Sequence, residues 1–299
     1  MRQIACPVCK VKPTETRKEF SIIDCINCKT SWTYIPNELD VDALYEDEVY
    51  AVVDNRESIF EKVIFREAKG VLNRANALLD KSHKKALDFG CGKGQFLAQA
   101  KKLGWSGVGI ETAKDRAKFA AEKYQVKVIN QFYSEGKVQE GDFHLICLNH
   151  VLEHLPEPIS LVNELLESNL AKGGLLYIEV PRADSWQAKI AGDNWIHWDI
   201  PKHLTHWTES GLLNQFESIG YIKVGAKPFS IHLGVLGMLQ SLFSLFGYRK
   251  HLILSLKKKK TAGLMLGVAL LTPFAFLMES IAALFSKSGV IGIYLKKNG

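Results

Sequence analysis

Short apolar runs alternate with amphipathic stretches between residues 83 and 228. The apolar runs have the length of buried strands, and the stretches between them carry apolar residues at helical spacing. Strands that alternate with helices in this way predict a parallel sheet covered by helices. The expected strands are 85–89, 107–111, 126–129, 143–148, 175–180, 221–226 and 290–295, and the expected helices are 95–103, 113–124, 159–170 and 209–219.

Three further stretches depart from this pattern: one is rich in cysteine, one has helical spacing and one is almost wholly apolar. The 299 residues suffice for one α/β domain and small accessory units. We therefore expect four parts: a cysteine-rich module at 1–36, a helical linker or cap at 37–82, the α/β domain at 83–228 plus 289–299, and a hydrophobic helical insertion at 229–288.

A glycine-rich loop follows the first expected strand of the α/β domain and reads Leu87-Asp88-Phe89-Gly90-Cys91-Gly92-Lys93-Gly94. Its glycines let the backbone turn sharply and approach a ligand, and the helix that follows presents free N–H groups. Dinucleotide-binding folds use such a loop too. A carboxylate at Asp88 would repel a pyrophosphate, however, and it suits a ligand that carries an amino group. Glu111 ends the next strand about 20 residues on, where an acidic side chain can accept hydrogen bonds from both ribose hydroxyls.

At these residues the chain resembles the class I S-adenosylmethionine (SAM)-dependent methyltransferases, whose first motif is an acidic residue followed by Gly-x-Gly-x-Gly. The resemblance continues through Asp142–Leu155, which is similar to the family's fourth strand and the loop beside the methyl donor. It implies an enzyme with an α/β, Rossmann-like seven-stranded methyltransferase sheet over residues 84–228 plus the last strand. It also implies the SAM-binding residues, which are Asp88, Gly90, Cys91, Gly92, Gly94, Glu111, Asn149 and His150.

Two points about the cofactor stay open in the sequence. Asn130-Gln131-Phe132 stands where relatives often place an acidic contact to adenine, so the adenine contact is not assigned. The alternative reading of the whole domain is a nicotinamide-binding Rossmann domain. Asp88 before the glycines and the Leu-Glu-His loop at 152–154 both argue against that alternative.

Two Cys-x-x-Cys pairs stand near the N-terminus, separated by 15 residues. Four thiolates at such spacing suit a tetrahedral Zn²⁺ ion, and the site would be structural because no coordination position stays open. The alternative is a redox pair, which would not require both motifs. The expected zinc ligands are Cys6, Cys9, Cys25 and Cys28, whereas Cys91 and Cys147 are expected to be small buried residues.

Two histidine-bearing segments are candidates for the chemistry on the methyl acceptor. Methyl transfer is an in-line displacement that often requires removal of a proton from the acceptor. The first segment is His150-x-x-Glu153-His154. The second is the aromatic loop 186–207, whose end resembles a Pro-x-His-Leu-x-His-aromatic-Thr segment that lies over the substrate pocket in small-molecule members of the family. The expected catalytic residues are Glu153, His154, His203 and His206.

The sequence leaves three interpretations of these histidines open. Glu153 and His154 can shape the pocket through hydrogen bonds to the backbone, or one of the histidines can act as a general base. The third is a second metal site formed by His150, Glu153 and His154 with a histidine of the later loop, because some relatives bind Mg²⁺ through a Glu-x-x-Glu-His segment. His150 replaces the first Glu of that segment here, which weakens the inference for Mg²⁺.

The expected insertion contains two uncharged apolar runs, 229–247 and 261–278, of which Pro273 is expected to interrupt the second. Basic residues at 249–250 and 257–260 lie between the runs. This pattern predicts a monotopic hairpin that dips into an anionic membrane surface. The alternatives are a pair of spanning helices and a helical cap that packs on the pocket or on a second subunit.

The function predicted from these features is SAM-dependent methylation of a small or lipid-linked acceptor, such as a saccharide or a quinone-like compound. Similar zinc-ribbon methyltransferases act on nucleotide sugars, and ubiquinone-type O-methyltransferases share the Glu-His loop. The alternatives are an rRNA methyltransferase and a non-catalytic zinc-ribbon interaction protein. The acceptor atom and the oligomeric state stay open.

Charge and cysteine content restrict the partners and the location. The net charge of +6 is too small to indicate nucleic acid, and the basic residues do not cluster with aromatic residues in the cysteine module. The first residues contain no apolar run long enough for a signal peptide. The six cysteines are therefore expected to be reduced thiols or metal ligands, in a cytoplasmic protein at the inner face of the membrane.

Overall fold

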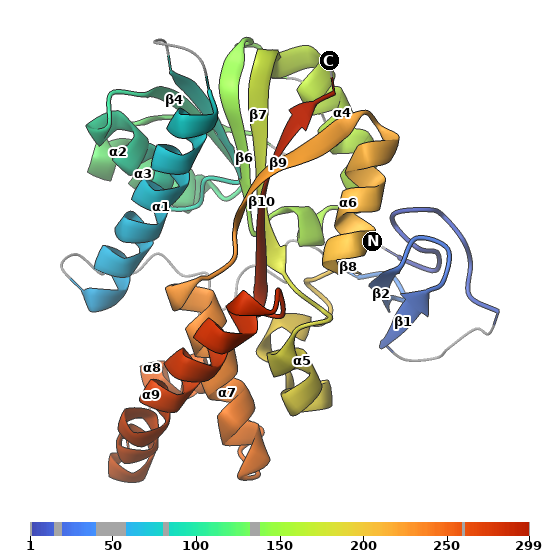
Figure 1. Cartoon of the computed structure of the whole chain (residues 1–299), viewed down its shortest axis with the longest axis vertical. Helices are drawn as coiled ribbons and strands as arrows, with labels where there is room; N and C mark the ends of the chain where they lie inside the picture. Colours follow the sequence, from blue (N-terminus) through green and yellow to red (C-terminus); the bar gives the residue numbers. More distant parts are fainter. Residues whose placement is uncertain are drawn as a thin grey trace. The chain divides into compact units, whose positions relative to one another are not determined.

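The computed structural model describes residues 2–14, 20–39, 58–79, 84–131, 138–258 and 261–298 (Figure 1). The acidic stretch 40–54, Phe132 and two residues of the lysine run, Lys259 and Lys260, lie outside the described residues. Contacts divide the chain into two compact units, and the predicted part boundaries themselves stay predictions. We call Val52–Val180, Leu212–Lys227 and Gly292–Gly299 the sheet unit, and Met1–Ala51, Pro181–Gly211 and Pro228–Ile291 the ribbon–insertion unit.

A seven-stranded sheet in the order β5-β4-β3-β6-β7-β10-β9 forms the sheet unit, which confirms the predicted fold class. β3 pairs in parallel with both β4 and β6, and β10 is antiparallel to β9. The order doubles back at β3, so the loops after β3 and β6 lie side by side at the carboxyl edge of the sheet, where ligands bind in folds of this type. The strands are β3 (Lys85–Phe89), β4 (Ser106–Glu111), β5 (Lys127–Asn130), β6 (Phe143–Asn149), β7 (Leu170–Pro181), β9 (Tyr221–Lys227) and β10 (Val290–Lys297).

Helices cover both faces of this sheet, with α1, α2 and α3 on one side and α4 and α6 on the other (Figure 1). Ser58 caps α1, because its hydroxyl accepts a hydrogen bond from the amide of Glu61 at 3.0 Å. The apolar face of α1 packs through Leu72 and Ala75 into a buried cluster with Leu145 and Tyr177. The helices are α1 (Ile59–Leu78), α2 (Gln95–Lys102), α3 (Lys114–Tyr124), α4 (Pro158–Asn169) and α6 (Glu209–Ser218).

The ribbon–insertion unit begins with a small three-stranded antiparallel sheet. Its first two strands, β1 (Ser21–Cys25) and β2 (Thr30–Tyr34), come from the cysteine module. Its third strand, β8 (Thr205–His206), comes from the aromatic loop 186–207, where the sequence predicts no strand. The cysteine module and this loop are therefore one structural piece.

The insertion is helical, as predicted, but its two apolar runs differ in structure. The first run contains a π-helical turn, Ile231–Val235, and the short buried helix α7 (Leu236–Leu245). The second run is one continuous helix, α9 (Ala262–Leu284), so the expectation that Pro273 interrupts it is wrong. In the turn that Pro273 weakens, the Thr272 hydroxyl donates to the carbonyl of Val268 at 2.6 Å. The remaining helices of this unit are α5 (Trp186–Ala191), α8 (Leu252–Lys258) and two short 3₁₀ turns, Gly192–Asn194 and Ile196–Trp198.

Candidate functional site

The glycine loop between β3 and α2 adopts a conformation that requires glycine at three positions. Gly90, Gly92 and Gly94 have φ values of 80°, 53° and 78°, in the left-handed region. A side chain at Gly94 would lie 2.7 Å from the Cβ atom of Ala120 in α3, so this glycine also permits helix packing. A side chain at Gly92 would meet nothing within 4 Å. The backbone at Gly92 is therefore open to the approach of a ligand.

Glu111, at the end of β4, fixes the loop from the neighbouring strand. Its buried carboxylate accepts hydrogen bonds from the amides of Gly92 at 2.9 Å and Ala113 at 2.8 Å, one on each oxygen. The Arg116 guanidinium lies 3.0 Å from the same carboxylate. The Oε1 atom has two donors, the Ala113 amide and the Arg116 guanidinium. A further donor can therefore use Oε2, which accepts from Gly92 and has a second lone pair.

Asp88, in β3, is a second buried carboxylate at this edge of the sheet. The amide of Asn149, at the end of β6, contacts its Oδ1 atom at 3.4 Å. Burial raises the pKa of Asp88 to about 7, against the lowering effect of Asn149, and the nearby charge of Glu111 raises it further. A carboxyl group in this state gains from a cationic partner.

The backbone of this region depends on two residues that were not assigned from the sequence. The Asn130 amide donates to the carbonyls of Glu111 and Thr112, at 2.7 and 2.8 Å, so it holds the chain after β4. A side chain at Gly109 would lie 2.5 Å from the sulfur of Cys91. The predicted cofactor residue Cys91 is thus buried against β4. Only an alignment would have shown Gly109 and Asn130 as positions with a fixed task.

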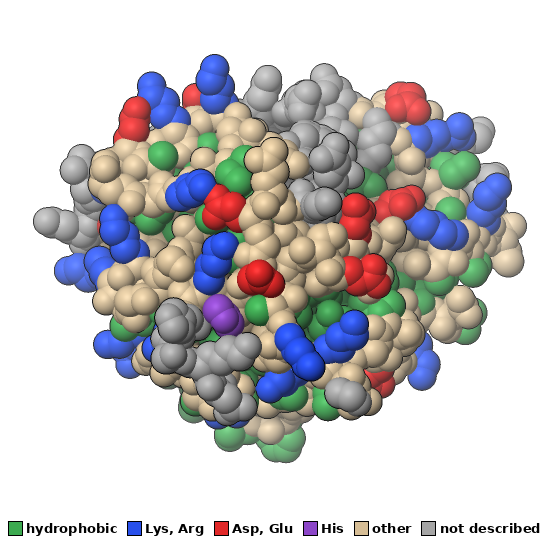
Figure 2. Space-filling view, turned by 90° about the horizontal axis from the view of Figure 1, so that it is seen from above, with side chains coloured by type: hydrophobic (Ala, Val, Ile, Leu, Met, Phe, Trp, Pro, Cys, Tyr) green, Lys and Arg blue, Asp and Glu red, His purple; other side chains and the backbone are tan. Residues whose placement is uncertain are grey.

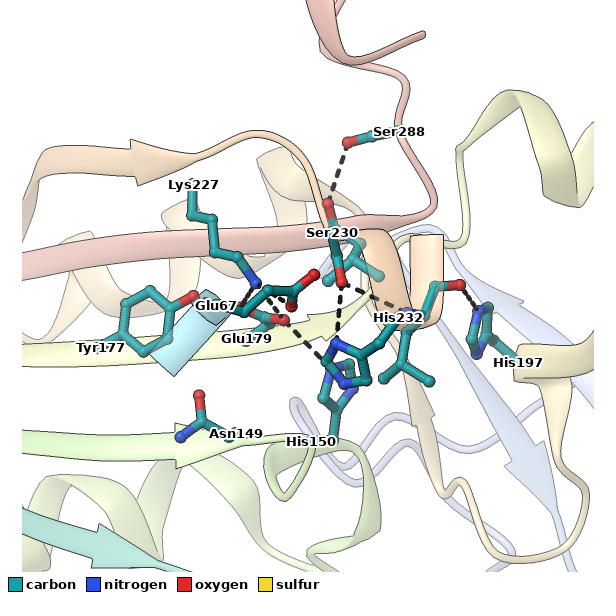
Figure 3. Close-up of polar contacts among 12 residues, drawn as sticks. Glu67, Asn149, His150, Tyr177, Glu179, His197, Lys227, Ser230, His232 and Ser288 are labelled. Carbon is teal, nitrogen blue, oxygen red and sulfur yellow. Dashed lines mark hydrogen bonds and ion pairs between the residues drawn. The ribbon is translucent and has the colours of Figure 1, made fainter. Parts of the chain in front are cut away.

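In the sheet unit, a buried network of charged residues connects β6, β7, β9 and α1 (Figure 3). His150 follows β6 with a φ of 55°, and its amide donates to the carbonyl of Glu179 in β7 at 2.8 Å. Its ring lies between two carboxylates, with Nδ1 3.4 Å from Glu153 and Nε2 3.5 Å from Glu179. Each ring nitrogen therefore faces a carboxylate.

Lys227, in β9, joins two carboxylates of the same network. Its ammonium lies 2.8 Å from Glu179 and 2.9 Å from Glu67 in α1. The Tyr177 hydroxyl also donates to Glu179 (Figure 3). A side chain at Gly292 would lie 2.9 Å from both Lys227 and the Tyr177 hydroxyl, so glycine makes room for these groups. Glu67, Tyr177, Glu179 and Lys227 were missed from the sequence, because they lie on four separate elements and form no local motif.

The charges of this network determine its protonation states. Burial alone would raise the pKa of Glu179, but the Lys227 ammonium and His150 hold it well below its usual range. Burial works against the protonated ring of His150, yet Glu153 and Glu179 raise its pKa to about 9. Glu179 and Glu67 raise the pKa of Lys227 in the same way. At neutral pH, Glu179 is thus ionised and His150 is protonated.

The predicted catalytic residues fall into the two units. Glu153 is buried and His154 is half-buried, and both lie on a 3₁₀ turn, Leu152–His154, in the sheet unit. His203 and His206 lie in the ribbon–insertion unit and are both buried. Within the sheet unit, Glu153 lies 3.4 Å from the predicted cofactor residue His150. Within the ribbon–insertion unit, Thr33 of the cysteine module contacts His203 and His206.

His206 has a structural hydrogen bond inside the small sheet. The Thr33 hydroxyl donates to the carbonyl of His203 at 2.6 Å, and the Nε2 atom of His206 lies 2.9 Å from the oxygen of that hydroxyl. Since the single hydroxyl proton goes to the carbonyl, Nε2 of His206 must carry a proton and donate. The Nδ1 atom of His203 contacts the carbonyl of His197 at 2.8 Å, which also orients that ring.

The four N-terminal cysteines lie together, with all four sulfur atoms within 4.8 Å of one another. The sulfurs of Cys6 and Cys28 are 3.6 Å apart and those of Cys9 and Cys25 are 3.3 Å apart. A Zn–S bond of about 2.3 Å with tetrahedral angles places sulfurs about 3.8 Å apart, so this cluster fits Zn²⁺.

Each Cys-x-x-Cys pair has the same backbone turn. The lysine after each pair, Lys10 or Lys29, has a positive φ, and its amide donates to the carbonyl of the first cysteine at 2.9 Å. Two turns of one shape present the two pairs of sulfurs to a common centre. The cysteine cluster is thus built by the local sequence of each pair as well as by the sheet between them.

Comparison with known proteins agrees with this geometry. The family described as "Methyltransferase domain" matches residues 60–224, which is more than half of the chain. The ubiquinone biosynthesis O-methyltransferase of Methylococcus capsulatus is 26% identical over 161 residues, which cover 46% of this chain and 67% of that protein. The segment that matches the family, 60–224, runs from α1 into β9, so it includes the glycine loop and the turn after β6.

Two solved structures share the fold. One is a putative sarcosine dimethylglycine methyltransferase from Galdieria sulphuraria, with 14% identity, a TM-score of 0.51 and coverage of 87% of this chain and 92% of that one. The other is the [4+2]-cyclase SpnF, with 19% identity, a TM-score of 0.52 and coverage of 82% and 84%. The chain belongs to the methyltransferase-domain family, and it is a class I SAM-dependent methyltransferase whose four N-terminal cysteines lie together as in a zinc ribbon.

Proposed function

We propose that this enzyme transfers the methyl group of SAM to a small organic acceptor at the carboxyl edge of the seven-stranded sheet. SAM supplies an electrophilic methyl group on a sulfonium. The observation that carries the proposal is the pair of buried carboxylates, Asp88 and Glu111, at the ends of adjacent strands beside an open glycine loop. The residues that hold the cofactor are Asp88, Gly90, Cys91, Gly92, Gly94, Glu111, Asn149 and His150.

The two carboxylates have different tasks in this proposal. Asp88 pairs with the amino group of the cofactor, because its raised pKa reflects a buried carboxyl group that lacks a compensating cation. Glu111 accepts from a ribose hydroxyl, since its Oε2 atom accepts from Gly92 and has a second lone pair. The open backbone at Gly92 lets the cofactor approach the loop.

Calorimetric titration with SAM tests the cofactor site. Asp88→Asn is expected to weaken SAM binding about tenfold or more, since the residue loses a charge-assisted contact. Asp115→Asn is the matched control, because Asp115 is exposed on α3. Wild-type affinity is expected to rise between about pH 6 and pH 8, as Asp88 ionises, and the rise is expected to shrink in Asp88→Asn. Equal SAM affinity in wild type and Asp88→Asn contradicts the proposed site.

For the acceptor, we infer that Glu153 and His154 handle the proton, while the Glu179–Lys227 pair holds His150 in position. Glu153 and His154 adjoin Asn149 and His150, which are among the proposed cofactor residues. His203 and His206 stay candidates for contact with the acceptor. Glu153→Gln is expected to lower kcat and to leave SAM affinity within about twofold, because a base acts on the acceptor and not on the cofactor.

The acceptor class is a small molecule with an oxygen nucleophile, of the saccharide or quinone-like kind. The 26% identity with a ubiquinone biosynthesis O-methyltransferase supports this class. Nucleic acid is not favoured, because Lys and Arg side chains are interspersed with Asp and Glu on the face that Figure 2 shows. Isotopically labelled SAM and a cell extract reveal the acceptor as a product with a shifted mass. Labelling confined to RNA contradicts the proposal.

We also infer that the cysteine cluster holds one structural Zn²⁺ ion. Elemental analysis of the purified chain is expected to give about one zinc per molecule, and Cys9→Ser is expected to lose it. Cys147→Ala is the matched control, because Cys147 is a buried thiol in β6, outside the cluster. A chain without zinc that keeps its far-ultraviolet circular dichroism and its melting temperature contradicts a structural role for the metal.

The cytoplasm fits the chemistry of the six cysteines, which are all free thiols in the structure. We propose that the enzyme works there, and that its acceptor is carried by a lipid. The lipid-linked acceptor is supported by helix α9 of the insertion, which exposes apolar side chains and buries its one acidic residue.

A further inference from the structure

The helix α9 has the reverse of the usual distribution of polar and apolar side chains. Glu279 is the one Asp, Glu, Lys or Arg residue in its sequence, and that residue is 0% exposed. Leu270, in contrast, is 60% exposed. A surface helix in water normally buries its apolar stripe and exposes its charges. The inverted pattern indicates that something other than water contacts the outer face of α9.

Hydrogen bonds fix which face of α9 points inward. Glu279 accepts from the amide of Gly289 at 2.7 Å and from the side chain of Gln187 at 3.0 Å. Gln187 is itself buried, and it accepts a hydrogen bond from the Trp195 indole at 3.0 Å. A side chain at Gly234 would lie 2.7 Å from the Glu279 carboxylate, so glycine permits the approach. The rotation of α9 about its axis is thus set by its single charged residue.

Large apolar side chains form a stripe along the outer face of α9. They follow one another at intervals of three and four residues, which places them on one side of a helix. The stripe comprises Leu266, Leu270, Phe274, Leu277, Ile281 and Leu284. α9 is the one described helix that is long and apolar enough to cross a membrane. The 18-residue segment that meets this test has a mean hydropathy of 1.9, and 11% of that segment is buried.

The neighbouring helix α7 has the opposite character. Met238, Leu239 and Leu242 are buried in the core of the insertion, which also contains Ala275 of α9. The exposed apolar residues at the end of α7 are Leu245 and Phe246. α7 is therefore the inner helix of the insertion, and α9 is the outer one.

Basic residues flank this apolar surface. Arg249 and Lys250 are exposed directly after the apolar end of α7. A run of four lysines, 257–260, immediately precedes α9 in the sequence. Cationic side chains next to an apolar face complement a layer of anionic headgroups above a hydrocarbon phase. A second copy of this chain or a soluble partner would not require this combination.

The chain enters and leaves the insertion at the same place. Lys227, which precedes the insertion, pairs with Gly292, which follows it, in the antiparallel ladder of β9 and β10. A helix that crossed a bilayer singly would leave its two ends on opposite sides. The paired strands favour a hairpin that dips into one leaflet.

We propose that the outer face of α9, with the apolar end of α7, docks on an anionic phospholipid bilayer as a monotopic contact. The docking surface does not depend on the proposed function. What rests on that function is the acceptor: a methyltransferase held at the bilayer acts on an acceptor carried by a lipid. The stripe enters the acyl boundary, while the exposed Arg249 and Lys250 contact the headgroups. Glu279 stays inside the protein and holds the helix in the orientation that the contact requires.

Flotation with vesicles tests the docking without reference to catalysis. The full chain is mixed with vesicles of phosphatidylcholine and phosphatidylglycerol, or of phosphatidylcholine alone. The test variant is Leu270→Glu/Leu277→Glu, and the control is Ile26→Glu/Ile222→Glu, which replaces two exposed apolar residues elsewhere with the same change in net charge. We expect wild type and control to float with anionic vesicles, and the affinity of the test variant for these vesicles to be at least about tenfold lower.

Each other outcome overturns the proposal. These outcomes are wild type that stays in the soluble fraction, equal flotation of test variant and control, and a wild-type dimer in vesicle-free buffer that the test variant alone loses. The last result assigns the face to a second copy of the chain. SAM titration of the same samples separates the two ideas, because vesicle binding without SAM binding contradicts the proposed function and leaves the docking surface intact.

Discussion

The two compact units each bury a glutamate at the centre of a polar network, and they stabilise it in opposite ways. In the sheet unit, Glu179 pairs with the Lys227 ammonium, and its pKa is held well below the usual range. In the ribbon–insertion unit, Glu279 accepts hydrogen bonds from neutral amides of Gly289 and Gln187, and burial raises its pKa. Burial alone therefore does not determine the charge of a carboxyl group. The donors that surround it do.

This difference follows from what each network has to do. The network of Glu179 lies at the carboxyl edge of the sheet, beside His150 and the other proposed cofactor residues, where fixed charges can act on a reaction. The network of Glu279 orients a helix, for which neutral hydrogen bonds suffice. Ionised groups in the first network and neutral donors in the second predict different responses to mutation and to pH.

The largest effect is expected from Lys227→Met. The substitution leaves Glu67 and Glu179 buried without the ammonium between them, and the loss of one partner from a buried ion pair costs roughly 3–5 kcal/mol. Denaturant unfolding measures this loss. Lys223→Met, on an exposed position of the same strand, is the control and is expected to change the free energy of unfolding by less than about 0.5 kcal/mol.

A second variant sharpens the result. Replacing Glu179 by Gln as well removes one of the uncompensated charges, so Lys227→Met/Glu179→Gln is expected to recover part of the stability that Lys227→Met loses. If Lys227→Met costs no more than the Lys223→Met control, the carboxylates are not held by the ammonium, and the contrast between the two units fails.

A smaller effect is expected from Thr33 in the ribbon–insertion unit, whose hydrogen bonds are to neutral groups. Thr33→Val removes the hydroxyl that donates to the carbonyl of His203 and contacts His206, at a cost of roughly 1–2 kcal/mol. Thr205→Val is the matched control, because the hydroxyl of Thr205 is buried and has no hydrogen-bond partner among the described residues. The control is expected to be neutral or stabilising. Equal destabilisation by both variants would show that loss of the hydroxyl, and not of its partners, is what matters.

The sheet unit was largely predictable from sequence because its signals are local. Period and length predicted all seven strands of the sheet within a few residues, apart from the longer β7, and the glycine loop lies between β3 and α2 as expected. Asp88 and Glu111 stand at strand ends, where the chain's own order places them. Such features depend on neighbours in the sequence, which a single sequence displays.

The remaining features depend on contacts between distant segments. The ribbon sheet takes β8 from residues 205–206, far beyond the cysteine module, and two residues are too short to have a period. Lys227 reads as the polar end of a strand until Glu67 and Glu179 are seen beside it. The single acid of α9 looks like a surface charge in the sequence, because its burial depends on Gln187 from another helix.

The smallest effect distinguishes the two glutamates by pH. Because the pKa of Glu279 is raised above its unfolded value of about 4.5, its contribution to stability is complete below that pH and is lost as the pH rises through the folded pKa. Glu179 has the opposite sign: its pKa is lowered, so its contribution is present above about pH 4.5 and is lost as the pH falls.

Glu279→Gln keeps a neutral side chain at every pH. We therefore expect the stability of Glu279→Gln relative to wild type to increase, by about 1 kcal/mol or less, as the pH rises from 4.5. Unfolding in denaturant at a series of pH values measures this difference, with Glu217→Gln on the exposed face of α6 as the control. A difference that decreases with rising pH would mean that the fold lowers the pKa of Glu279, and the two networks would then shift the pKa of their carboxylates in the same direction.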